Sequence, residues 1–175
     1  GEIRAPEVIL TAQTGIDVKS ADIDVYASVF DGDFALTSSE SVTLKDILVI
    51  DGSVDVTTRR SLYAERVVIE TDAVGNDIHL TTTGENVDFD ASAFFKDANI
   101  EIDYLEVGRQ FGGVHLDSNW LAREIDDSDL DDLATGIDIV ANFLNVKVAG
   151  LFGDPSDPER ILELDLTDPD GLTIS

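Results

Sequence analysis

The chain has 175 residues, a hydrophobic fraction of 43% and a formal net charge of -26, from 37 acidic and 11 basic side chains. A field of this sign repels nucleic acid and anionic lipid, so neither is expected as a partner. The chain has no cysteine, which excludes thiolate metal sites and cysteine nucleophiles. No apolar run is long enough to span a bilayer, so we expect no membrane insertion.

A short apolar phrase with a Thr recurs four times in the first half of the chain. The Thr residues of successive copies are 26, 20 and 24 positions apart. A second apolar phrase follows each copy, and in three copies a third phrase comes after it. The four copies are Val8-Ile9-Leu10-Thr11-Ala12, Phe34-Ala35-Leu36-Thr37-Ser38, Val54-Asp55-Val56-Thr57-Thr58 and Ile78-His79-Leu80-Thr81-Thr82.

These phrases alternate apolar and polar residues with period two and are rich in β-formers, which indicates strands. Three short strands in about 20–26 residues predict one coil of a parallel β-helix, a solenoid whose stacked coils share a continuous core. A β-propeller blade needs about 40–50 residues, and a β-sandwich would show tight hairpin turns such as Asn-Gly. We expect Leu10, Leu36, Val56 and Leu80 to stack in one interior ladder, with the neighbouring Thr side chains as stacked structural hydroxyls.

The second half of the chain departs from this period and then returns to it. Regular coils are expected over 1–107, although the period loosens after Asp90. Gly108, Gly112 and Gly113 interrupt the strand pattern, and the apolar residues Leu121 and Ile125 have helical spacing. They predict that 108–136 leaves the regular coils as a partly helical excursion. Resumed coils are expected over 137–175, so that 1–175 forms a single segment. The chain begins with Gly, contains no Met and finishes on an apolar strand phrase, so we expect a piece of a larger protein.

Phrases of the type Gly-x-Ile/Val-x-Leu-Thr-Ala/Ser, as at 32–42 and 52–62, resemble the repeats of filamentous-haemagglutinin-like exoproteins. The segment 136–166, with its Gly-Leu-Phe-Gly-Asp-Pro-Ser-Asp-Pro loop, is similar to a turn type of giant exoproteins of this kind. The resemblance covers about two thirds of the chain. It implies a right-handed β-helix, a location outside the cell or on its surface, and a role in adhesion or surface architecture. It implies no purpose for residues 108–136.

The densest set of carboxylates is a candidate Ca²⁺ site formed by Asp127, Asp129, Asp131 and Asp138. Their spacing matches the oxygen ligands at positions 1, 3, 5 and 12 of a calcium loop. The sixth position is Asp132 where the loop needs Gly, and the last ligand is Asp rather than Glu. A capped helical turn, with Ser128 as the N-cap, and an unstructured acidic loop are the alternatives.

No catalytic or cofactor site is assigned. His79 and His115 each alternate with aliphatic neighbours, which indicates outward surface positions, and no nucleophile elbow or phosphate-binding loop is present. The sequence therefore favours a non-enzymatic, structural or adhesive segment that forms a rigid acidic stalk or filament. Its expected partners are neighbouring repeats of the same polypeptide, other copies of it, or surface glycans. The alternative is an extracellular β-helix enzyme, a polysaccharide lyase or hydrolase, which a concave site with converging carboxylates would reveal.

Overall fold

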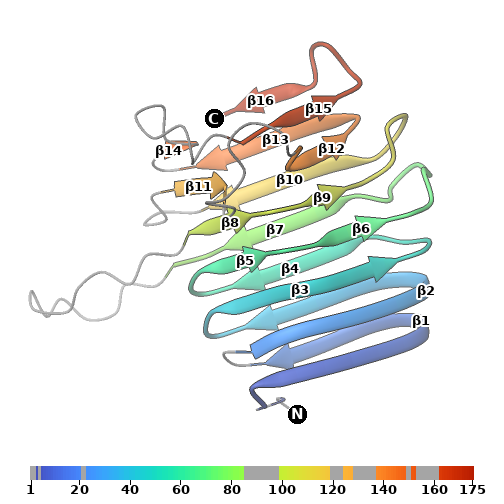
Figure 1. The fold of residues 1–175 in the computed structure, drawn as a ribbon, viewed down its shortest axis with the longest axis vertical. Coiled ribbons are helices and arrows are strands. Elements are labelled where there is room, and N and C mark those ends of the chain that lie inside the picture. The colour runs from blue at the N-terminus through green and yellow to red at the C-terminus, as the bar shows by residue number, and fades with distance from the viewer. Residues whose placement is uncertain are drawn as a thin grey trace, which may run out of the picture.

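The computed structural model describes Ile3 and residues 5–20, 23–84, 99–118, 124–127, 137–148, 151–152 and 162–175, which form strands and turns without a helix. Within this part of the chain, no helix is available that could cross a membrane. The strands, labelled in Figure 1, are β1 (Glu7–Ser20), β2 (Ile23–Ser38), β3 (Val42–Val49), β4 (Val54–Thr58), β5 (Leu62–Ala64), β6 (Val67–Ile69), β7 (Ile78–Thr82), β8 (Ile100–Ile102), β9 (Leu105–Glu106), β10 (Gly113–Ser118), β11 (Glu124–Asp127), β12 (Ile139–Ala141), β13 (Phe143–Val148), β14 (Leu151–Phe152), β15 (Leu164–Leu166) and β16 (Leu172–Ile174).

All these strands belong to one sheet, and their pairings are parallel. Eleven of them follow a path in the order β14-β11-β8-β5-β3-β2-β4-β7-β10-β13-β16, and the sheet nearly closes on itself into a barrel-like shape. The long strands β1 and β2 pair from Glu7↔Asp24 to Ser20↔Ser38, with one irregularity between Thr14 and Ile16. The expectation of an all-β fold with parallel strands is therefore confirmed. Figure 1 shows the two chain termini at opposite ends of the molecule.

Side chains of alternate residues point into a core that runs along the whole sheet. In β2 the pattern of burial alternates with period two, and in β4 and β7 the first, third and fifth residues are all buried. We use the word column for residues that are partners across successive strands. The main inner column has Leu36, Val56, Leu80, Leu116 and Val146, each at most 2% exposed.

Three members of the predicted interior ladder are confirmed, because Leu36, Val56 and Leu80 are partners in β2, β4 and β7. The inclusion of Leu10 is wrong. Leu10 pairs with Ala27, and the partner of Leu36 in β1 is Val18. The step from β1 to β2 is shorter than the spacing of the Thr phrases suggests, so the first Thr phrase aligns with a different part of β2. The same shift separates Thr11 from the column of Thr37, Thr57 and Thr81.

The described part of 108–136 consists of a turn at 109–111 and two strands, β10 and β11, rather than a helix. β10 pairs in register with β7 on one side and β13 on the other, and β11 pairs with β8 and β14. The reason is that Val114 and Leu116 alternate with polar residues in the same period-two pattern as Ile78 and Leu80. Residues 119–123 and 128–136, which carry the rest of the helical expectation, lie outside the described residues.

One turn of the sheet depends on glycine because the backbones of successive strands come very close there. Gly52 has a φ of 141°, and a Cβ at this position would lie 2.3 Å from the carbonyl oxygen of Gly32. A Cβ built on Gly32 would in turn lie 3.0 Å from the backbone nitrogen of Gly15. Only glycine fits such a contact at a positive φ.

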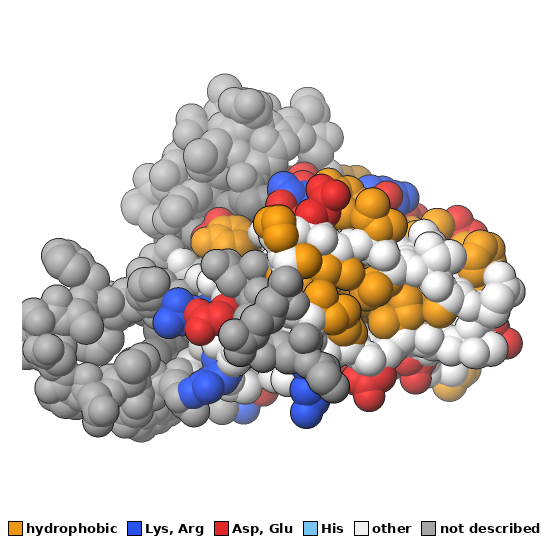
Figure 2. All heavy atoms as spheres, turned by 90° about the horizontal axis from the view of Figure 1, so that it is seen from below, with side chains coloured by type: hydrophobic (Ala, Val, Ile, Leu, Met, Phe, Trp, Pro, Cys, Tyr) orange, Lys and Arg blue, Asp and Glu red, His pale blue; other side chains and the backbone are white. Residues whose placement is uncertain are grey.

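The inward side chains of the first strand are less covered than those of the strands behind it. Val8, Leu10, Ile16 and Val18 of β1 are half-buried, whereas the inward residues of β2 and β3 are buried. Figure 2 looks onto this end of the molecule and shows apolar side chains gathered across it. At the opposite end, all three residues of β16 are exposed.

Candidate metal-binding site

A second column faces outward on the half of the sheet that contains β4, β7, β10, β13 and β16. Each member lies between two inward residues of its strand, so the period-two alternation directs it to solvent. Unlike the inner column, the outer column changes chemical character from strand to strand. Its members, from β1 to β16, are Asp17, Ala35, Asp55, His79, His115, Asn145 and Thr173.

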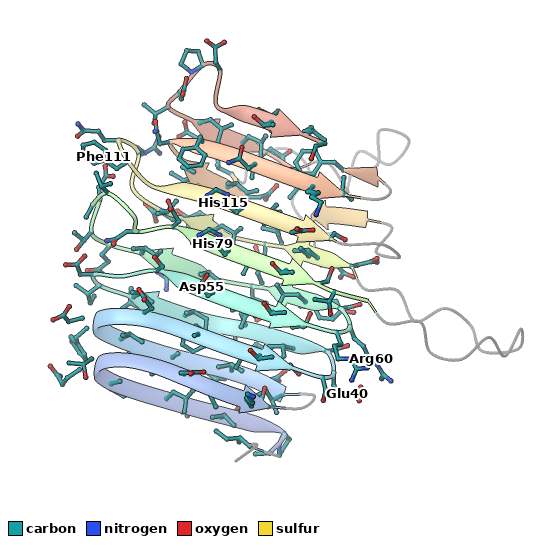
Figure 3. The ribbon with its side chains drawn as sticks, turned by 180° about the vertical axis from the view of Figure 1, so that it is seen from behind. Glu40, Asp55, Arg60, His79, Phe111 and His115 are labelled. Atoms are coloured by element: carbon teal, nitrogen blue, oxygen red, sulfur yellow. The ribbon has the colours of Figure 1, made fainter. Side chains whose placement is uncertain are left out.

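The two histidines of the chain are neighbours in this column and stack on each other. His79 in β7 is the partner of His115 in β10, and their ring centroids are 4.4 Å apart with planes at 9°. Phe143 meets the His115 ring edge-on at a centroid distance of 5.4 Å. Figure 3 shows Asp55, His79 and His115 one above another on successive strands. Their outward direction agrees with the sequence, but their contact was not anticipated.

Asp77 places a carboxylate beside the two rings. It lies two residues before His79, on the same side of the chain, and its Oδ1 accepts a hydrogen bond of 2.8 Å from the backbone N–H of Gly113. One ligand atom each from Asp77, His79 and His115 lies within 4.8 Å of the other two, and all three residues are half-buried. We call these three residues the His–Asp cluster.

The surroundings of His115 disfavour its charged form. Burial lowers the pKa of His115 most, and the neighbouring His79 lowers it further, while the negative charge of Asp77 acts in the opposite direction. The amide nitrogen Nδ2 of Asn145 lies 3.4 Å from Nδ1 of His115 and donates to that atom when it is unprotonated. The His115 ring is therefore favoured in its neutral form.

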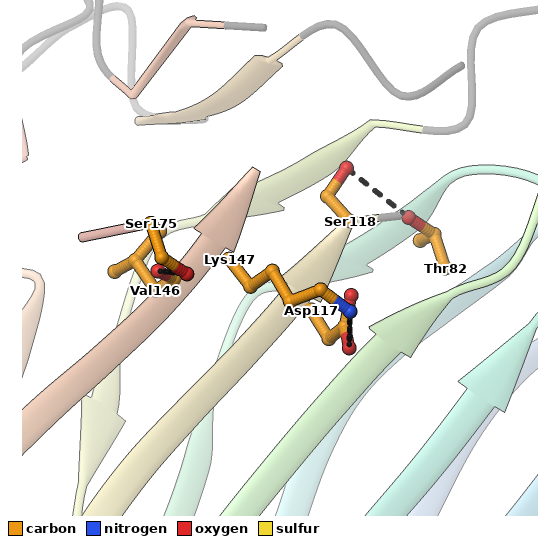
Figure 4. Close-up of polar contacts among 6 residues, drawn as sticks. All are labelled: Thr82, Asp117, Ser118, Val146, Lys147 and Ser175. Carbon is orange, nitrogen blue, oxygen red and sulfur yellow. Dashed lines mark hydrogen bonds and ion pairs between the residues drawn. The ribbon is translucent and has the colours of Figure 1, made fainter. Parts of the chain in front are cut away.

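A shallow pocket of about 400 Å³ lies over this part of the outer face. The side chains around it include His79, His115, Asn145 and an ion pair in which Nζ of Lys147 lies 3.1 Å from Oδ2 of Asp117. Figure 4 shows this pair beside the buried hydroxyls of Thr82 and Ser118, whose oxygens are 3.4 Å apart. The pocket thus combines imidazole, carboxylate and ammonium groups on one face.

Only Asp127 and Asp138 of the four residues of the predicted calcium site lie in the part of the chain that the structure describes. Asp138 is 5% exposed, and its Oδ2 accepts a hydrogen bond of 2.6 Å from the backbone N–H of Glu163. Asp127 is the last residue of β11, a strand rather than the start of a helical turn. Asp129 and Asp131 lie outside the described residues. The calcium site therefore stays a prediction.

The sequence contains a pattern that points to the His–Asp cluster. Ile78-His79-Leu80 and Val114-His115-Leu116 have the same arrangement of an aliphatic residue, a histidine and a second aliphatic residue. Aligning the two phrases places the histidines next to each other, as the sheet does. The interval of 36 residues between them exceeds the expected coil length and hid the match.

Comparison with family models, curated protein sequences and solved structures finds no match to this chain.

Proposed function

We propose that this chain is a segment of a right-handed parallel β-helix in a large secreted or cell-surface protein, similar to filamentous-haemagglutinin-like exoproteins, and that it acts as a rigid acidic stalk or filament. The observation that carries the proposal is the unbroken register of the columns. The outer column continues through six strand-to-strand steps from Asp17 to Thr173, and the inner column accompanies it. Because each strand is aligned on the one before it, such a stack forms a straight and stiff rod.

Ion pairs between successive strands support a stiff outer wall. Arg60 pairs with Glu40 at 2.6 Å, Arg66 pairs with Asp46 at 2.5 Å, and Lys45 pairs with Glu65. Each pair joins residues 20 positions apart, so all three link the same two neighbouring turns of the sheet. Single exposed pairs contribute only about 0–1 kcal/mol. For a stalk their value is that the three act together on one step, and the pair of Lys147 with Asp117, at 3.1 Å, links two other turns.

The apolar side chains of β1 are only half-buried, which indicates that a partner stacks on this end of the sheet and covers them. An end strand also presents unpaired backbone N–H and C=O groups, which accept a further parallel strand. We propose further repeats of the same polypeptide, or other copies of it, as these partners. The excess of carboxylates keeps the remaining surface hydrated and is suited to cations, so Ca²⁺ and surface glycans stay as proposed ligands of the parent protein.

The stalk function can be tested by placing the chain between two compact fluorescent domains and measuring energy transfer in single molecules. A rigid spacer holds the two domains at one separation, so the efficiency should form a single narrow peak that is the same in low and high salt. A Val56→Asp variant, which disrupts the core, should broaden the peak. A broad or salt-dependent peak for the unmodified chain would contradict a rigid stalk.

The pocket over the outer face favours a second candidate, an extracellular carbohydrate-active enzyme. Asp117, Lys147 and the two histidines supply acid, base and cationic groups in one concavity. This candidate predicts that the chain depolymerises an acidic or neutral polysaccharide and that Lys147→Gln abolishes the turnover. If the chain is only a stalk, none of the polysaccharides tested should be depolymerised.

A further inference from the structure

We propose that Asp77, His79 and His115 together bind one divalent transition-metal ion of the zinc type. The site lies on the outer face of β7 and β10 and uses none of the acidic residues considered for calcium. It is independent of the stalk function, because it requires only the local register of two strands.

The ligand atoms of the His–Asp cluster are near enough to one another to form a three-ligand metal site. Zinc binds imidazole nitrogen at about 2.0–2.1 Å and carboxylate oxygen at about 2.0–2.2 Å, so two ligand atoms on one tetrahedral ion lie about 3.4 Å apart. The three ligand atoms here are within 4.8 Å of one another. The two rings lie stacked with planes at 9°, so binding requires the side chains to rotate until the three lone pairs point to one ion. Three protein ligands leave a fourth position for water or another ligand.

The donor set selects the class of metal. Two imidazoles and one carboxylate suit Zn²⁺, Ni²⁺, Cu²⁺ or Fe²⁺, whereas Ca²⁺ needs six to eight oxygen ligands. The absence of cysteine from the chain removes thiolate competitors. The net charge of -26 raises the local concentration of any cation near the surface. The carboxylates therefore attract ions generally, and the histidines make this position selective.

Groups around the cluster hold its ligands in place, as outer-shell partners do in metal sites. The backbone N–H of Gly113 donates to Oδ1 of Asp77, and Phe143 packs edge-on against His115. The side-chain amide of Asn145 lies beside Nδ1 of His115. Because an amide offers both a donor and an acceptor, Asn145 can turn its Oδ1 toward the ring and accept a hydrogen bond from Nδ1–H of His115, which leaves the lone pair of Nε2 for the metal.

A bound ion would connect two strands that are far apart in the chain. His79 and His115 are 36 positions apart in sequence but are direct partners across β7 and β10. The ion would therefore fix the register of these two strands and stabilise the folded chain, because the three ligands are assembled only when the strands are paired.

The test uses Zn²⁺ and the full chain, with calorimetry for affinity and nitrogen-15 NMR of the imidazoles. With only two histidines in the chain, both side chains are assigned by comparing His79→Gln with His115→Gln. We expect one Zn²⁺ per chain, shifts of both imidazoles at that stoichiometry, and a higher melting temperature. An outer-shell partner contributes about 10–100-fold to metal affinity, so losing either histidine should weaken Zn²⁺ binding by at least about 100-fold.

Two further variants separate this site from general attraction by the acidic surface. Asp77→Asn keeps an acceptor for Gly113 but removes the charge, and should weaken binding with an unchanged circular dichroism spectrum. Asp46→Asn removes a carboxylate outside this site that is paired with Arg66, and should leave the Zn²⁺ affinity unchanged. Unsaturable binding, binding that both histidine variants retain, or imidazole resonances that do not shift would each overturn the proposal. Millimolar Ca²⁺ should leave both imidazoles unaffected.

Discussion

The inner and outer columns of β4, β7, β10 and β13 differ by a single residue position and have opposite rules of composition. The inner column is Val56, Leu80, Leu116 and Val146, all aliphatic and almost fully buried. The outer column beside it is Asp55, His79, His115 and Asn145. The comparison shows that the inward side chains determine the fold, and that the outward ones are free to carry chemistry.

The largest effect is expected from a charge in the inner column. Val56→Asp puts an unpaired carboxylate among Leu36 and Leu80, and should cost more than about 4 kcal/mol, a large part of the stability of a typical domain. The next residue, Thr57, belongs to the outward side of β4, so Thr57→Asp should change the free energy of unfolding by less than about 1 kcal/mol. Urea titrations followed by circular dichroism measure both. Similar losses in the two variants would remove the distinction between the columns.

A smaller effect is expected where the backbones of neighbouring strands touch. Gly52→Ala introduces a Cβ 2.3 Å from the carbonyl oxygen of Gly32, as well as an unfavourable positive φ, and should cost at least about 1–3 kcal/mol. Gly75 also has a positive φ, of 90°, but no atom lies within 4 Å of its ideal Cβ position. Gly75→Ala should therefore cost less than Gly52→Ala in thermal unfolding. The reverse order would show that the close approach at Gly52 is absent.

The smallest effect concerns pH and the outer column. His115 has a lowered pKa when folded, mainly through burial and then through His79, while Asp77 acts against both. Below the unfolded value of about 6.5 the unfolded chain binds more protons at this site, so stability falls as the pH drops from above 6.5 through the folded pKa. With a chelator present, melting temperatures between pH 8 and pH 5 should fall less in His115→Gln than in the unmodified chain. Parallel curves would contradict this account of the His115 environment.

The sequence was sufficient for the strands and for most of the inner column, because period-two alternation and repeated phrases report directly which side chains are buried. Leu10 was misplaced because the step between β1 and β2 differs from the spacing of the Thr phrases. The stacking of His79 and His115 was not predicted, since pairing across 36 residues depends on how much chain lies between the strands. The contact of Asp77 with Gly113 depends in turn on that pairing. Where the number of residues between successive strands varies, a single sequence therefore gives little information on which residues pair.

The central claim is that one outer column continues straight from β1 to β16. The chain has no cysteine, so Asp17→Cys and Thr173→Cys can carry a unique pair of spin labels. Six strand-to-strand steps of about 4.8 Å predict a narrow distance distribution near about 29 Å between the two labelled positions. The pair Asp55→Cys and Thr173→Cys is four steps apart and should give about 19 Å. Two narrow peaks in this ratio would support the continuous stack, and a broad distribution, or equal distances for the two pairs, would contradict it.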